Sequence, residues 1–155
     1  MTVQPNNQST KQNPVGRFMV AVGAVIENQD TGKILLIQRS ATLDWHKSEW
    51  EIDYGRLDQF EDPLVGLKRE IFEEVGITDL RPQQIIRVWH MDRGPKTAEN
   101  DLIGITYYCL TTQTQVVLSD EHQQYAWVNP AEALELVKIE GIREDLIHYI
   151  NLKNG

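Results

Sequence analysis

The chain has 155 residues, of which 41% are hydrophobic and 25% charged, and its formal net charge is −8 at pH 7. This composition is that of a soluble globular protein long enough to form one domain with its own core. So negative a charge argues against non-specific binding to nucleic acid polymers or to anionic membranes, and we expect neither as a partner.

Membrane and secretion signals are missing from the sequence. No stretch is apolar and long enough to span a bilayer, and the first residues lack the apolar segment of a signal peptide. A cytoplasmic location is therefore expected. The single cysteine, Cys109, lies in the apolar run ITYYCL and cannot form an internal disulfide, which predicts a buried, unreactive thiol.

The N-terminal third predicts a tail followed by the first strands of one domain. Residues 1–15 are rich in Gln, Asn and Pro and are predicted to be a flexible tail, with a single domain over residues 16–155. Residues 18–26 and 34–37 are apolar and β-prone, and the turn signal NQDTG between them predicts a hairpin. Residues 40–48 are predicted to be a polar loop, and residues 50–53 a short strand.

A helix is predicted after this strand. Asp62 and Pro63 form a helix-start signal, an N-cap carboxylate before a proline at the first helical position, and Gly76 is a suitable stop. Four apolar residues recur at helical spacing and are predicted to pack inward: Leu64, Leu67, Ile71 and Val75.

Three glutamates of this helix indicate a metal site. Glu70, Glu73 and Glu74 are spaced i, i+3 and i+4, so they project from one arc near the negative end of the helix dipole. Mg²⁺ or Mn²⁺, which prefer carboxylate oxygens, would neutralise them. Glu61 precedes the helix and can reach back to it, and Arg69 can orient the glutamates. A solvated acidic face is the alternative for an isolated pattern of this kind.

The rest of the chain predicts a mixed fold. Strands are expected at residues 84–91 and 102–110, joined by a loop over residues 92–101, and at residues 116–118 and 125–128. Helices are expected at residues 130–137 and 142–152. No repeat and no second domain are apparent. The order of elements predicts an α/β (α+β) fold with one sheet between helices.

The segment from Gly55 to Ile77, GRLDQFEDPLVGLKREIFEEVGI, fits G-x5-E-x7-R-E-U-x-E-E-x-G-U at all nine constrained positions, where U is aliphatic. This pattern is the Nudix box, and over about residues 17–150 the chain resembles the Nudix hydrolases, which include the MutT proteins. The resemblance implies an α/β/α sandwich with a central mixed sheet. It also implies Mg²⁺-dependent hydrolysis, by water, of a nucleoside diphosphate linked to another group X, with Mn²⁺ as a substitute cation.

The resemblance also implies roles for the residues of the box. Glu73 and Glu74 would be metal ligands, and Glu70 a ligand or the general base. Arg69 would hold the glutamates in place. The main-chain carbonyl of Gly55 or of its neighbour Tyr54 would supply a further metal ligand, and Glu61 would support the loop or reach a metal through water.

Weaker signals lie outside the box. Arg39 follows an apolar strand where a phosphate-contacting residue is common in the family, or it is an ordinary surface arginine. Trp50 and Tyr54 are candidate substrate contacts, although core packing suits Trp50 better. Glu121 precedes a strand and would complete the metal shell or act as base, or it is a solvated loop acid.

The loop departs from the usual family pattern. Asp53 and Tyr54 precede Gly55 where Pro-Gly-Gly is common, and Phe60 stands where a glycine often precedes the first glutamate. A lost glycine removes tolerance for positive φ and for close backbone approach. The departures leave the substrate class more open than metal binding.

The leading interpretation is hydrolysis of a (deoxy)nucleoside triphosphate, or a similar small triphosphate, to the monophosphate and pyrophosphate. The alternatives are a pyrophosphatase of ADP-ribose or another nucleotide sugar, and a Nudix-fold regulatory domain that binds a nucleotide without turnover. The expected partner is a small diphosphate-containing molecule. Many relatives dimerise, so a homodimer is a further expectation, although no interface can be located in the sequence.

Overall fold

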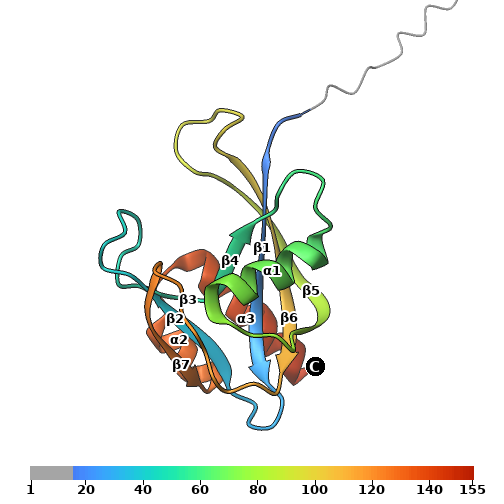
Figure 1. Cartoon of the computed structure of the whole chain (residues 1–155), viewed down its shortest axis with the longest axis vertical. Helices are drawn as coiled ribbons and strands as arrows, with labels where there is room; N and C mark the ends of the chain where they lie inside the picture. Colours follow the sequence, from blue (N-terminus) through green and yellow to red (C-terminus); the bar gives the residue numbers. More distant parts are fainter. Residues whose placement is uncertain (1–15) are drawn as a thin grey trace, which may run out of the picture.

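The computed structural model describes residues 16–155, and a mixed seven-stranded sheet lies between helices on both of its faces (Figure 1). The predicted α/β/α sandwich is confirmed. The predicted tail, residues 1–15, lies outside the described residues. The elements are β1 (Met19–Asn28), β2 (Ile34–Arg39), β3 (Trp50–Glu51), β4 (Asp53–Arg56), α1 (Pro63–Val75), β5 (Arg81–Asp92), β6 (Asp101–Thr111), β7 (His122–Val128), α2 (Pro130–Leu136) and α3 (Glu140–Asn154).

The sheet has the strand order β3-β2-β1-β6-β5, with β4 also paired to β1 and β7 to β2. Strands β1 and β6 are parallel along their whole length, and the other pairs are antiparallel. The predicted hairpin of β1 and β2 is limited to one register pair, Glu27 with Ile34. Beyond it the two strands separate, and β4 takes the place beside β1, with Gly55 opposite Val22. This separation brings the start of the box into the sheet.

Helix α1 covers one face of the sheet. Its residues Leu67, Ile71 and Val75 are buried against Val22 and Ala24 of β1. Burying apolar surface at roughly 25 cal/mol per Å² is what holds this layer in place. The prediction that Leu64 also packs inward was wrong, because its side chain is 45% exposed. Leu57, from the loop before the helix, packs against this core beside the first turn instead.

Helices α2 and α3 cover the opposite face, where Ala133 and Leu146 join a second buried cluster with Val25, Ile34 and Tyr108. Alternate residues of β1 therefore serve the two cores, Val25 on this face and Ala24 on the other, as the period of a strand requires. None of the helices among residues 16–155 is long and apolar enough to cross a bilayer.

The predicted strand at residues 116–118 was wrong. This segment runs along the end of α1 without joining the sheet: the N–H of Val117 donates to the Val75 carbonyl at 3.0 Å, and that of Ser119 to the Glu74 carbonyl at 3.0 Å. The last carbonyls of a helix lack partners within the helix, so they can accept these bonds. The segment thereby holds Ser119 beside the glutamates.

Cys109 of β6 is fully buried, as predicted, and this burial raises the pKa of its thiol to about 12. Because the thiolate is the reactive form, we expect Cys109 of the native protein to react with a disulfide reagent such as DTNB at pH 8 at least about 100-fold more slowly than a free thiol. In guanidinium chloride one thiol per chain should react at once. Rapid labelling of the native protein would contradict the buried position.

Candidate active site

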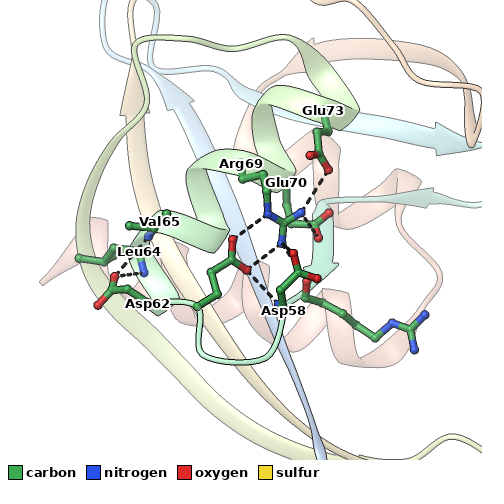
Figure 2. A network of polar contacts seen from close by, with 9 residues as sticks. Asp58, Asp62, Leu64, Val65, Arg69, Glu70 and Glu73 are labelled. Carbon is green, nitrogen blue, oxygen red and sulfur yellow. Dashed lines mark hydrogen bonds and ion pairs between the residues drawn. The ribbon is translucent and has the colours of Figure 1, made fainter.

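Helix α1 begins and ends where its sequence predicts. The Asp62 side chain accepts hydrogen bonds from the N–H groups of Leu64 (2.9 Å) and Val65 (3.3 Å), and Pro63 occupies the first helical position (Figure 2). Gly76 ends the helix with a φ of 70°, a left-handed conformation that favours glycine. The helix is therefore fixed at both ends, and its glutamates have defined positions.

Arg69 joins the glutamates to the preceding loop. Its Nε and Nη2 donate to the two carboxylate oxygens of Glu61 at 2.7 and 2.8 Å. Its Nη1 donates to Glu70 at 2.9 Å and to Glu73 at 3.2 Å (Figure 2). Bidentate pairs of this kind are strong and directional. The Arg69 guanidinium, helped by the Asp58 N–H, lowers the pKa of Glu61 to about 2. Glu61 thus ties the loop to the helix in this structure, and a contact with a metal through water stays a prediction.

Glu70 lies directly against the backbone of β4. A β-carbon added at Gly55 would be only 2.0 Å from the Glu70 Cδ, so only glycine leaves room for this carboxylate. Burial raises the pKa of Glu70, although Arg69 opposes the shift. The Glu73 side chain is 53% exposed, whereas those of Glu70 and Glu74 are 15% and 17% exposed. The structure therefore brings Glu70 and Glu74 to the sheet and leaves Glu73 facing outward with Arg69.

Glu74 belongs to a buried polar network that the sequence did not reveal. His122 lies with Nδ1 3.2 Å from Glu74 Oε2 and with Nε2 2.9 Å from Glu51 Oε1, and Ser119 Oγ donates to Glu74. Burial would lower the pKa of His122, but the contacts with Glu51 and Glu74 outweigh it and raise the pKa to about 9. This pKa favours the charged imidazolium at neutral pH, and the contact with His122 is the main cause that lowers the pKa of Glu74.

Arg39 lines the same cleft, but its side chain is occupied. Nη1 lies 3.1 Å from Glu51 Oε1, and Nε donates to the Trp45 carbonyl at 3.0 Å. In this arrangement Arg39 positions Glu51 and the loop over residues 40–49, and a phosphate contact remains a prediction. Glu121, the predicted acid before β7, is exposed at the edge of the cleft. Its neighbour His122 makes the contact with Glu74 instead.

Asp53 is an acid to which the sequence analysis assigned no role in the site. It is 4% exposed, and neither of its carboxylate oxygens has a hydrogen-bond partner among residues 16–155. Burial, reinforced by the charge of Glu74, raises the pKa of Asp53 well above its usual range. Strand alternation was the available signal, because it places Glu51 and Asp53 on the same face as Gly55. The sheet face under α1 therefore carries Glu51 and Asp53 in addition to the glutamates of the helix, and carboxylate oxygens are the ligands that a hard divalent cation prefers.

Tyr54 and Trp89 pack edge to face on the sheet face covered by α3, opposite the acids. With Trp45 and His90 they line the large cleft that also borders Glu70 and Glu74. Trp50, predicted as a substrate contact, is not among its lining residues and packs against the core under α2 and α3, as the packing alternative expected. The Tyr54 hydroxyl donates to Asp145 at 2.7 Å and also contacts Thr106, so the phenol is anchored.

Four arginines that sequence reasoning did not single out also line the cleft: Arg17, Arg56, Arg87 and Arg93. They supply the local positive charge that an anionic substrate needs in a chain of net charge −8.

Phe60 stands where many family members have a glycine before the first glutamate of the box. It adopts a φ of 67°, where a non-glycine residue costs about 1–2 kcal/mol, and its side chain is 98% exposed. The ring therefore stands at the mouth of the cleft without packing into the body of the protein.

Comparison with known proteins agrees with this geometry. A family model described as NUDIX domain matches residues 17–150. Nucleoside triphosphatase NudI of Escherichia coli is 29% identical over 128 residues, which cover 78% of this chain and 81% of that protein. A crystal structure of a MutT protein from Methanosarcina mazei Go1 superposes with a TM-score of 0.70 at 25% identity, covering 91% of this chain and 98% of that chain.

An Ap4A hydrolase from C. elegans, at 23% identity, shares the fold with a TM-score of 0.72 over 88% of this chain and 98% of that chain. The chain therefore belongs to the NUDIX domain family. With this domain and its nucleoside triphosphatase relatives, it is a hydrolase that acts on phosphoric anhydride bonds.

Proposed function

We propose that this hydrolase is a Mg²⁺-dependent pyrophosphohydrolase that cleaves (deoxy)nucleoside triphosphates, or similar small triphosphates, to monophosphate and pyrophosphate. The observation that carries the proposal is the pair of largely buried carboxylates that borders the cleft, with Glu70 against Gly55 of β4 and Glu74 held by His122 and Ser119. The similarity to nucleoside triphosphatase NudI supports the triphosphate as the substrate.

The carboxylates have distinct parts in this proposal. Glu70 and Glu74 would hold the cation together with the Gly55 carbonyl, and Glu73 would join them by turning inward from its exposed position. A bound divalent ion would supply charge stabilisation at the phosphate oxygens and a more acidic water. Glu70 is the candidate general base, because its burial raises its pKa toward the working range of a base.

The substrate would be placed by the remaining cleft residues. A base can stack on Trp45 or Trp89, which both line the cleft. Arg56 and Arg93 are positioned to meet the phosphates, since among their described contacts neither is paired with a carboxylate. Arg69 would keep the glutamates in register throughout.

The test is a substrate panel with purified protein: the dNTPs, oxidised dGTP, dinucleoside polyphosphates, NADH and ADP-ribose, each with Mg²⁺ and with EDTA. EDTA-sensitive release of pyrophosphate from a triphosphate is the expected result. Cleavage confined to ADP-ribose or another nucleotide sugar would move the activity to the runner-up class. Metal binding without turnover of any compound would favour a nucleotide-binding regulatory domain.

A further inference from the structure

Strand alternation puts Asp53 beneath helix α1. Asp53 lies opposite Ala24 of β1, and Gly55 lies opposite Val22. Ala24 and Val22 both belong to the core under α1, so the Asp53 side chain is on the α1 face. Ile52 belongs to the other core, as the alternation requires.

The carboxylates of α1 lie above this strand. Glu70 rests on Gly55, and Glu74 is one helical turn further along, where His122 links it to Glu51. Along the chain Asp53 lies between Glu51 of β3 and Gly55 of β4. Its carboxylate is therefore on the same face of the sheet as Gly55, against which Glu70 rests.

Asp53 differs from these three acids in having no ion-pair partner among residues 16–155. Glu51 has Arg39 and His122, Glu70 has Arg69, and Glu74 has His122. Both Asp53 oxygens are buried without a hydrogen-bond donor among the described residues. A buried carboxylate without a partner destabilises the fold.

A divalent cation would satisfy this group. We propose that Asp53 is a metal ligand of this protein, contributed by β4 from outside the box, and that it shares a divalent cation with Glu70 and Glu74. The inference rests on the proposed function, because it takes the cation to be the one that the hydrolase uses. It adds a side-chain ligand from β4 to a site otherwise built from glutamates of α1 and the Gly55 carbonyl.

The substitution Asp53→Asn tests the proposal, because it removes the charge and keeps the shape of the side chain. We expect the dissociation constant for Mn²⁺, measured by electron paramagnetic resonance, to rise at least about 10-fold. In EDTA the melting temperature should stay unchanged or rise, since an unpaired charge is gone. The increase in melting temperature on adding Mg²⁺ should become smaller. A residue with a purely structural role would not combine an unchanged or higher melting temperature in EDTA with a smaller increase on adding Mg²⁺.

Asp30→Asn is the matched control. Asp30 lies exposed in the turn between β1 and β2, its carboxylate makes no described contact, and the variant loses the same charge. Its Mn²⁺ affinity should equal that of the wild type. Unchanged Mn²⁺ affinity in Asp53→Asn would overturn the proposal while leaving hydrolysis by the wild type in place. A wild type that binds no divalent ion would overturn both.

A second measurement does not depend on the folding of a variant. In wild-type protein labelled with ¹³C at the aspartate carboxyls and assigned by NMR, Mg²⁺ should shift the Asp53 signal and leave that of Asp30 unchanged. An Asp53 signal that does not move at saturating Mg²⁺ would overturn the proposal.

Discussion

Glu74→Gln is expected to lower kcat by about 1,000-fold while the fold remains intact. Glu74 is 17% exposed at the sheet face of α1 and is held there by Ser119 and His122. A glutamine can keep hydrogen bonds to both groups, so the side chain should stay in place. It loses the negative charge that a divalent cation requires, and with it the electrostatic stabilisation of the reacting phosphate.

The measurement is steady-state kinetics with the preferred triphosphate, alongside circular dichroism and thermal unfolding. Glu135→Gln in α2 is the control, because Glu135 is exposed and far along the chain from the box. It should retain wild-type activity. Full activity in Glu74→Gln would contradict a metal role for this residue. Absence of turnover in both the variant and the wild type would support the nucleotide-binding alternative.

Gly55→Ala is expected to lower kcat by about 100-fold and the free energy of unfolding by about 1–3 kcal/mol. The new methyl group would be 2.0 Å from the Glu70 Cδ and 2.1 Å from its Oε2, which no van der Waals contact tolerates. Either the Glu70 carboxylate or strand β4 must move. A displaced Glu70 loses its position both as a metal ligand and as a base, whereas a displaced strand strains the sheet.

Urea unfolding gives the change in stability, and the substrate assay gives the change in kcat. Gly141→Ala in α3 is the matched control, because a methyl group there meets only Arg87 Nη2 at an ordinary 3.6 Å. A variant Gly55→Ala with wild-type stability and wild-type kcat would show that the close approach of Glu70 to β4 is unimportant for the site.

Features that depend on neighbouring residues could be predicted from the sequence. Asp62, Pro63 and Gly76 act through hydrogen bonds and backbone angles within a turn of their own positions, and the structure confirms all three. Arg69 contacts Glu61, eight residues earlier in the chain. This agrees with the prediction that Glu61, which precedes the helix, can reach back to it. Leu64 was the exception, since its burial depends on what packs beside the first turn.

Features that depend on strand pairing could not be predicted in this way. The run at residues 116–118 has strand composition, yet N–H groups of this segment and of Ser119 bond to the last carbonyls of α1 and not to a strand. The hairpin of β1 and β2 shortens to one pair because β4 and β7 compete for the same strands. Such competition is decided by the burial of whole faces and not by local propensity.

The sequence by itself determined the family resemblance, the helix with its glutamates and the layered class of fold, because each is encoded in spacing along one segment. Only the tertiary structure decided which acids meet. His122 and Glu51 are separated by 71 residues and come together because β7 and β3 both pair with β2. Asp53 faces the glutamates because β4 pairs with β1. Contacts between distant segments follow from pairing and burial in three dimensions, which no short motif records.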